Sequence, residues 1–413
     1  MSIFSNNMKK EYRQALFLSA ILLVALVVGA NFMRVLEPIT SKPKLADAKI
    51  LIIYTGGTIG MIETSDGLKN VPNKGTEQLD KYLALYPDAR EKVGEYDILS
   101  YDPLIDSSNM APSDWNKMIK TIHDNYTKYD AFVIMHGTDT MAYTASALSF
   151  GLKGLDKPVV ITGAQEPLAK LRNDGINNLV CSLVYASMPN PLSEVVLIFN
   201  NVVYRGNRTK KLSPNKNSAF GSPNFPPLGK FGINFEYNVV VDDTGNIPTT
   251  KYQKYWQYQS KYLDPDYYSE DLNIPVVFMT PGIDFAMQTQ QVKTQKIDAI
   301  ILLTFGIGNG PDGNKSFQTF LRACKERNIP VYNISQCCQG RVEQGDYATG
   351  SFLSTMGVVG GLDLTLEAAF TKACWAATQY PQDASSQKRA FAQDLVGELS
   401  PPGTERFEIF IEV

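Results

Sequence analysis

Hydroxyl and carboxylate side chains gather in three short stretches that each follow an apolar run. These stretches are Thr55–Thr58 (TGGT), Ile105–Met110 (IDSSNM) and His136–Thr140 (HGTDT). Glycines let the backbone turn sharply and let another molecule approach it closely. The question the residues raise is whether the threonines react with a bound molecule or only cap turns.

Any one of these stretches is explained equally well by a tight turn. TGGT also lacks the GK[ST] ending of a phosphate loop and the GxGxxG spacing of a dinucleotide site. However, all three stretches follow predicted strands, and the carboxyl ends of strands in a doubly wound sheet face one crevice. Their common placement therefore predicts a single site.

Short apolar strands alternate with amphipathic helices over most of the chain. Strands are expected in 49–57, 96–104, 130–140, 157–165, 194–201, 274–282, 298–310 and 329–337. Helices are expected over 76–86, 112–126, 141–152, 174–186 and 315–328, with Ser113 as the cap of the second. Near-continuous apolar strands are typical of a parallel sheet that is covered on both faces.

The alternation predicts an α/β fold, with a doubly wound, mostly parallel sheet in a large N-terminal domain and a second, smaller α/β domain. Pro, Asn, Tyr and Gly dominate between about Ser213 and Asn273, where we expect irregular structure. We place the N-terminal domain at 49–235, the connector at 236–272 and the C-terminal domain at 273–413.

The amino-acid composition argues against several kinds of binding site. The 413 residues carry a net charge of −3 and a pI near 5.6, which gives no attraction to nucleic acid. Only two histidines, His123 and His136, are present, so a zinc site with several histidine ligands is nearly excluded. Five cysteines without CxxC spacing favour neither a disulfide framework nor a metal site, and we expect most of them to be small buried residues. We expect no metal site.

The first 48 residues differ from the rest. A basic region, 1–14, precedes an apolar segment, 15–33, that reads as a signal peptide or membrane anchor, and a polar linker follows at 34–48. A buried core helix is the alternative for the apolar segment. We expect a periplasmic protein, or one anchored in the inner membrane and facing the periplasm, with membrane contact only through this segment; a cytoplasmic location is the lesser alternative.

The motifs resemble those of a known family. YTGGTIGM (54–61) and MHGTDTMAYTASAL (135–148) look like the two signature motifs of the bacterial-type L-asparaginase/glutaminase family. The similarity continues in the family's order through VVITGAQEPL, LRNDGINNL, VVYRGNRTKK, FGIGNGP and QCCQGRVEQGDYATG. DSSNM, YRGNRTKK and DYATG are closer to the type I branch, so a leader before such a chain is an unusual combination.

The resemblance implies roles for particular residues. Thr58 corresponds to the nucleophile that is acylated, and Thr138, Asp139 and Lys211 match the second catalytic group. Chemically, amide hydrolysis without metal or histidine needs such a nucleophile, a proton acceptor and donors for the oxyanion. The backbone N–H groups around Thr138 are candidates for those donors.

The resemblance also implies the substrate and the assembly. Asp106, Ser107 and Ser108 fall where the family binds the α-carboxylate and α-ammonium groups of L-asparagine, and Asn309 resembles a residue that reaches the neighbouring subunit's site. A homodimer or homotetramer, no cofactor and no nucleic-acid partner are therefore expected. Hydrolysis of L-glutamine stays open as a side activity.

Several of these residues have simpler alternatives. Thr58 could cap the segment that follows it, Asp139 could be a helix N-terminal carboxylate, and Lys210 and Lys211 could be a solvated basic pair. His136 is better interpreted as a hydrogen-bonded structural imidazole than as a base. One departure from the family pattern is Leu68, which stands where related enzymes carry a tyrosine in the loop after TGGTI.

Two other functions compete with hydrolysis of L-asparagine. An exported protein that binds an amino acid without turnover would also suit two α/β domains around a cleft. The asparaginase-like subunit of the tRNA-dependent amidotransferase is the other alternative. The presence of Thr58, Thr138, Asp139 and Lys211 together favours the enzyme over pure binding, because binding needs neither a nucleophile nor the lysine.

Overall fold

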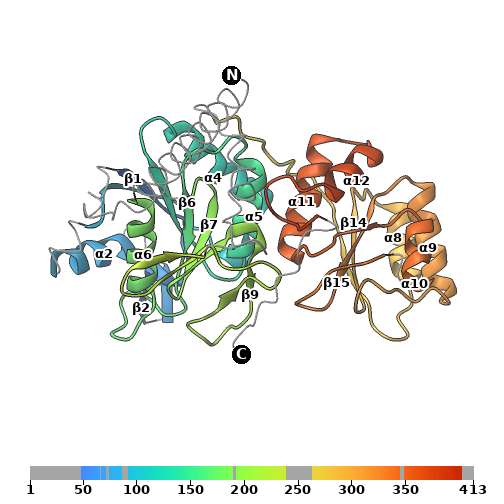
Figure 1. The fold of residues 1–413 in the computed structure, drawn as a ribbon, viewed down its shortest axis with the longest axis horizontal. Coiled ribbons are helices and arrows are strands. Elements are labelled where there is room, and N and C mark those ends of the chain that lie inside the picture. The colour runs from blue at the N-terminus through green and yellow to red at the C-terminus, as the bar shows by residue number, and fades with distance from the viewer. Residues whose placement is uncertain are drawn as a thin grey trace, which may run out of the picture. The chain divides into compact units, whose positions relative to one another are not determined.

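The computed structural model describes residues 48–65, 67–70, 74–85, 92–188, 192–238, 263–344 and 348–401 (Figure 1). The predicted basic region, the apolar segment 15–33 and nearly all of the predicted linker lie outside the described residues, as does 239–262 of the predicted connector. Within the described ranges, every helix is too short or too polar to cross a membrane.

The larger of two main sheets has the strand order β12-β11-β8-β7-β6-β5-β1-β4. Its parallel strands are β4 (Glu95–Ser100), β1 (Lys49–Tyr54), β5 (Ala131–Met135), β6 (Val159–Thr162) and β7 (Val195–Phe199). An antiparallel extension follows, made of β8 (Val202–Arg205), β11 (Gly229–Phe231) and β12 (Phe235–Tyr237). The predicted doubly wound, mostly parallel sheet is confirmed.

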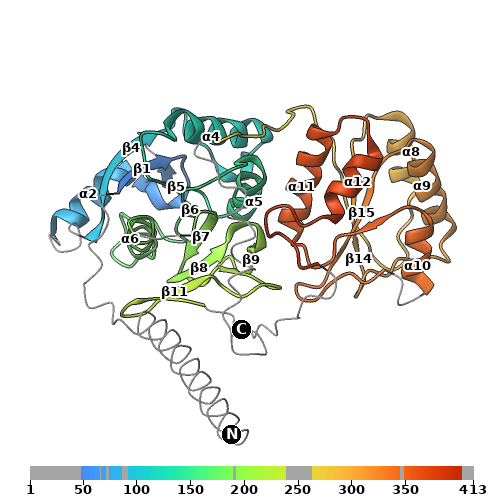
Figure 2. The ribbon, with the colours of Figure 1, turned by 45° about the horizontal axis from the view of Figure 1, so that its top comes forward.

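Helices cover both faces of this sheet (Figure 2). Helices α4 (Pro112–Asn125) and α5 (Met141–Gly151) lie on one face, and α2 (Lys74–Leu85) and α6 (Gly175–Ala186) lie on the other. Successive side chains of β1 alternate between two cores: Leu51 and Ile53 pack with α4 and α5, while Ile50 and Ile52 pack with α2 and α6. Burial on both faces explains why β5 and β7 are apolar at every position and why β1 is apolar after Lys49.

Two local predictions are wrong. The region after Ser213 is not irregular throughout, because it forms β10 (Phe220–Gly221), β11 and β12. These strands are two or three residues long, too short for a periodic pattern to reveal them. Ser113 does not cap α4, since the helix already begins at Pro112, and the backbone N–H of Ala111 donates instead to the Asp114 carboxylate at 2.9 Å.

The smaller sheet has the order β13-β14-β15-β16 and is parallel. Its strands are β13 (Val276–Phe278), β14 (Ile300–Thr304), β15 (Val331–Ser335) and β16 (Val359–Gly360). The helices of this domain are α8 (Ala286–Thr294), α9 (Lys315–Glu326), α10 (Ala348–Thr355), α11 (Leu366–Gln379) and α12 (Ala384–Ala392). The second, smaller α/β domain is therefore present as predicted.

The cysteines are all free thiols. Cys181, Cys324 and Cys374 are buried, whereas Cys337 and Cys338 are exposed. Burial raises the pKa of Cys181 to about 11 and the pKa values of Cys324 and Cys374 to about 12. The three buried thiols therefore stay protonated and serve as small apolar side chains, as expected for most of the five.

One buried ion pair links the two domains, and another lies within the smaller domain. Arg208 of the large domain lies 3.1 Å from Asp363, with side chains 2% and 9% exposed. Lys372 on α11 lies 2.5 Å from Glu398, and both side chains are fully buried. A charge in such a place is tolerated only while its partner and hydrogen bonds are kept.

We predict that Lys372→Met lowers the free energy of unfolding by about 3–5 kcal/mol, because the Glu398 carboxylate would stay buried without its counter-ion. Equilibrium urea unfolding followed by circular dichroism measures this. The matched control is Lys120→Met, which breaks the exposed pair with Asp124 and should leave the unfolding midpoint unchanged. Equal effects of the two substitutions would contradict the importance of the buried pair.

Candidate active site

The three polar stretches follow adjacent strands, because β1 lies between β4 and β5. Tyr54, the last residue of β1, is in register with Ser100 of β4 and Met135 of β5. The backbone N–H of Thr55 donates to the Met135 carbonyl at 3.1 Å, and the N–H of Ile105 donates to the Thr55 carbonyl at 2.7 Å. The predicted convergence of the three stretches is therefore confirmed at the carboxyl edge of the sheet.

Glycines allow two of these turns to meet backbone to backbone. A Cβ atom on Gly57 would lie 2.4 Å from both the Cα and the N of Gly137, and Gly57 has a φ of 90°. A Cβ atom on Gly137 would in turn lie 2.4 Å from the Ser107 Oγ. Any side chain at either glycine would push the turns apart.

The two threonines that flank Gly56 and Gly57 differ in their surroundings. Thr55 is buried, and its hydroxyl donates to the Met135 carbonyl at 2.9 Å. Thr58 begins the 3₁₀ turn η1 (Thr58–Gly60) and is half-buried, and across the described part of the chain its hydroxyl makes no hydrogen bond. Thr55 thus has a structural role, whereas the Thr58 oxygen is available to a bound molecule.

Lys211 joins Thr138 and Asp139 in one group. It lies in β9 (Lys210–Lys211), and its Nζ is 2.8 Å from the Thr138 Oγ1 and 2.9 Å from the Asp139 Oδ1. Thr138 is only 7% exposed. The ammonium donates to both oxygens, so the hydroxyl hydrogen of Thr138 must point elsewhere.

Gln165, a residue not predicted from the sequence, receives that hydrogen. The Thr138 hydroxyl donates to the Gln165 Oε1 at 3.2 Å, while the Gln165 Nε2 donates to the Pro214 carbonyl at 2.8 Å. The side-chain amide is thereby held in one orientation, which fixes the rotation of the Thr138 hydroxyl. Gln165 follows β6, so the strand-end rule that selected the other three stretches could have found it.

The predicted substrate-binding residues differ in their exposure and in the domain that carries them. Asp106 and Ser108 are exposed at the edge of the crevice, where the Asp106 Oδ1 accepts hydrogen bonds from the Ser108 N at 3.0 Å and its Oγ at 2.8 Å. Ser107 is buried, and its carbonyl accepts from the Thr140 hydroxyl at 2.7 Å. Asn309 lies apart from this group, in the turn after β14 of the smaller sheet.

One of the simpler alternatives can now be settled, and the position of Leu68 can be described. Lys210 and Lys211 are not a solvated pair, because Lys210 lies 3.2 Å from the Glu367 carboxylate and Lys211 lies 2.9 Å from Asp139. Leu68 falls in the second strand of a hairpin, β2 (Met61–Thr64) and β3 (Gly67–Asn70), opposite Glu63. Its side chain lies outside the described atoms, so its relation to Thr58 stays a prediction.

His136 is a buried structural imidazole. Its Nδ1 is 2.6 Å from the Gly137 carbonyl, and its Nε2 is 3.0 Å from the Thr144 hydroxyl. Thr144 also accepts a hydrogen bond from the Trp115 Nε1 at 3.3 Å, so its own hydrogen goes to His136. The neutral tautomer with Nδ1–H fits both contacts, and burial lowers the pKa of His136 to about 4.

Taken together, a free threonine hydroxyl, a lysine-bound threonine and a carboxylate define the kind of site that hydrolyses carbonyl compounds through a hydroxyl nucleophile. Comparison with known proteins is consistent with that class. The family model "Asparaginase, N-terminal" matches residues 49–241, and the model "Glutaminase/Asparaginase C-terminal domain" matches residues 273–391. The chain belongs to the asparaginase family, and the resemblance inferred from its motifs is confirmed.

Individual relatives agree with this assignment. L-asparaginase 1 of Escherichia coli is 42% identical over 354 residues, which is 85% of this chain and 98% of that protein. The 60 kDa lysophospholipase of Mus musculus is 34% identical over 380 residues, 87% of this chain and 64% of that protein. The crystal structure of L-asparaginase I from Vibrio cholerae aligns with a TM-score of 0.73 and 39% identity, covering 86% of this chain and 99% of that one.

We predict a pH dependence of stability that comes from His136. Because folding lowers its pKa from 6.5 to about 4, the unfolded chain binds a proton that the folded chain does not. Stability should therefore fall as the pH drops below about 6.5, by about 2 kcal/mol between pH 7 and pH 5 from this group alone.

Urea unfolding at both pH values measures this loss in the wild type and in His136→Gln, which should lose about 2 kcal/mol less. His123→Gln is the control, because His123 is exposed on α4 and its replacement should leave the wild-type pH dependence in place. Parallel pH profiles of the wild type and His136→Gln would contradict the buried neutral imidazole.

Proposed function

We propose that this chain is an amidohydrolase that converts L-asparagine and water to L-aspartate and ammonia. The observation that carries the proposal is the position of the Lys211 Nζ, within 2.9 Å of oxygens of both Thr138 and Asp139. A protein that only bound an amino acid would need no such group beside a free threonine hydroxyl. The E. coli relative named L-asparaginase 1, matched over 98% of its length, supports the substrate.

In the proposed first step, the Thr58 Oγ attacks the side-chain amide carbon of asparagine. A carbon–oxygen bond forms, the carbon–nitrogen bond breaks, and the Thr58 proton leaves on ammonia. In the second step water attacks the ester, aspartate is released and Thr58 regains a proton. Lys211 and Gln165 hold the Thr138 hydroxyl so that its oxygen can orient a reacting group, and the ammonium stabilises negative charge as it develops.

The charged end of the substrate lies at the edge of the crevice in this proposal. The α-ammonium group would pair with Asp106 or Asp139, whose side chain is 64% exposed. The Ser108 hydroxyl and neighbouring backbone N–H groups would receive the α-carboxylate. The buried Ser107 serves this site through its carbonyl contact with Thr140 and its packing against Gly137.

We further propose a homodimer or homotetramer in which Asn309 completes the site of a neighbouring subunit, and export or membrane anchoring through residues 15–33. Asn309 stands outside the Lys211 group of its own chain, which supports a role across an interface. Light scattering of the purified protein and fractionation of cells that express it test these two statements. A monomer with full activity would overturn the first, and a wholly cytoplasmic protein would overturn the second.

We predict that ammonia release from L-asparagine is nearly abolished by Thr58→Ala, by about 10⁴-fold or more in kcat, because the nucleophile is lost. Lys211→Met should lower kcat by about 10²–10⁴-fold through loss of the charged donor. The matched control is Lys293→Met, at an exposed lysine on α8 of the smaller domain, which should keep the wild-type rate. L-glutamine assayed in parallel measures the side activity.

One result would favour the alternative function. If the wild-type protein bound L-asparagine in calorimetry but released no ammonia, it would be a binding protein, and Leu68 would be the first residue to examine. Unchanged turnover in Thr58→Ala would instead overturn the assignment of the nucleophile.

A further inference from the structure

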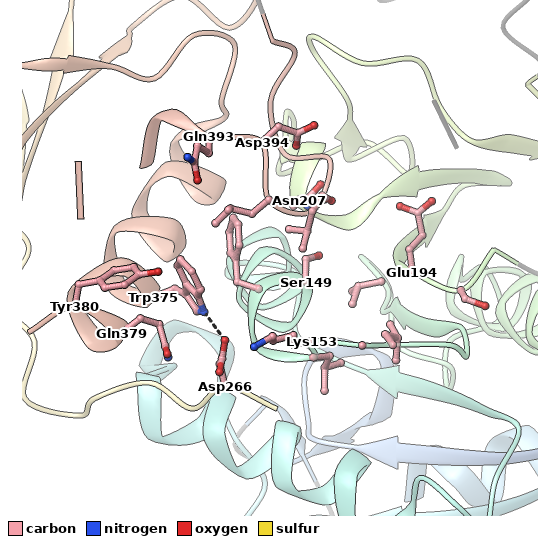
Figure 3. A pocket seen from close by; sticks show the side chains of 18 residues that line it. Ser149, Lys153, Glu194, Asn207, Asp266, Trp375, Gln379, Tyr380, Gln393 and Asp394 are labelled. Carbon is pink, nitrogen blue, oxygen red and sulfur yellow. Dashed lines mark hydrogen bonds between the residues drawn. The ribbon is translucent and has the colours of Figure 1, made fainter. Parts of the chain in front are cut away.

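A second cavity lies away from the candidate active site. Its volume is about 510 Å³, within the range of sites that hold small molecules (Figure 3). The last turn of α5 and the start of β7, including Leu152 and Val195, form one side of it, and α11 and the segment 393–396 form the other. Thr138 and Asp139 precede the opposite, N-terminal end of α5, so the two sites do not overlap.

One wall of this cavity is aromatic. The rings of Phe150 and Trp375 stack with centroids 6.4 Å apart and an angle of 30°. Tyr380 meets Trp375 edge-on at 6.2 Å and is 38% exposed. Such a wall suits a flat, apolar ring, which gains from offset or edge contacts.

Charges of both signs stand beside the aromatic wall. The Asp266 carboxylate is held by a hydrogen bond from the Trp375 Nε1 at 3.0 Å, and Lys153 also lines the cavity (Figure 3). Within the described ranges, neither Lys153 nor Asp266 forms an ion pair. A carboxylate and an ammonium that are both unpaired can receive the two charged groups of a zwitterion.

The other acidic side chains of the cavity are already engaged. Glu194 forms an ion pair with Arg205, with the Glu194 Oε2 2.7 Å from the Arg205 Nε. The Asp394 Oδ1 accepts a hydrogen bond from the Gly397 N at 2.9 Å. Lys153 and Asp266 are therefore the charged groups with capacity for a ligand.

Asn207 lies in the wall of the cavity and is held by the other domain. Asn207 is 1% exposed, and its Nδ2 donates to the Val396 carbonyl at 3.0 Å. Its Oδ1 has no hydrogen-bond partner in the described part of the chain. Because protein atoms cover this oxygen, Asn207 shapes the wall and offers no hydrogen bond to a molecule in the cavity.

We propose that this cavity binds a free aromatic α-amino acid. The α-carboxylate pairs with Lys153, the α-ammonium pairs with Asp266, and the ring lies against Trp375 and Tyr380. This site is separate from the site proposed for asparagine and does not depend on the proposed function.

The test is isothermal titration calorimetry of the full-length protein with L-tryptophan, in the presence of excess L-aspartate to occupy the candidate active site. Two matched probes are indole-3-propionate, which lacks the ammonium, and tryptamine, which lacks the carboxylate. L-tryptophan should bind at one site per chain, and each of the two probes should bind at least tenfold more weakly.

Variants locate the binding site. Lys153→Met and Asp266→Asn should each weaken binding of L-tryptophan at least tenfold, and asparagine at 266 can still accept the hydrogen bond from Trp375. Lys128→Met, at an exposed lysine elsewhere, and Asp106→Ala, in the candidate active site, should leave binding unchanged. Thermal unfolding checks that every variant is folded.

Three results would overturn the proposal. These are the absence of binding at millimolar L-tryptophan, equal binding of either matched probe, and binding that depends on Asp106 but not on Lys153 or Asp266. The last result would place the amino acid in the candidate active site.

Discussion

The contact between Gly57 and Gly137 is the constraint on which the site depends. A Cβ atom at position 57 would lie 2.4 Å from the backbone of residue 137, so the turns after β1 and β5 meet only because both residues lack side chains. This contact fixes the spacing between Thr58, just after one glycine, and Thr138, just after the other. A parallel sheet brings many strand ends together, but the glycines let these two hydroxyls share one crevice.

The smaller domain holds the third member of the site in place. Lys211 lies in a two-residue strand, which alone would hold its side chain in place only weakly. Three residues earlier, Arg208 is buried, pairs with Asp363 and donates to the Glu398 carbonyl at 2.8 Å. The neighbouring Lys210 is tied to Glu367 at the start of α11. Charged groups of the smaller domain thus anchor the segment that leads into Lys211 at two points, Arg208 and Lys210.

Much of the fold and of the candidate site could be predicted from the sequence, because burial leaves a clear pattern of apolar residues. Strands buried on both faces are mostly apolar, so β1, β5, β6, β7, β14 and β15 could be predicted, and polar residues after β1, β4 and β5 marked the crevice. The short antiparallel strands β10, β11 and β12 could not be predicted, because two or three residues are too few to show an alternating hydrophobic pattern. Arg208 and Glu398 were also missed, since charged residues are surface residues by default and only the fold reveals that their partners are buried. Gln165 was within reach, because it follows a predicted strand as the other site residues do.

The most direct test of the account is to identify the residue that becomes acylated. The Lys211→Met protein is mixed with L-asparagine, quenched in acid within seconds, digested and mapped by mass spectrometry. The account predicts an aspartyl ester on the peptide that contains Thr58, and on Thr58 itself. An ester on Thr138, or full turnover by this variant with no ester on Thr58, would contradict the arrangement in which Thr58 attacks and the Thr138–Asp139–Lys211 group assists.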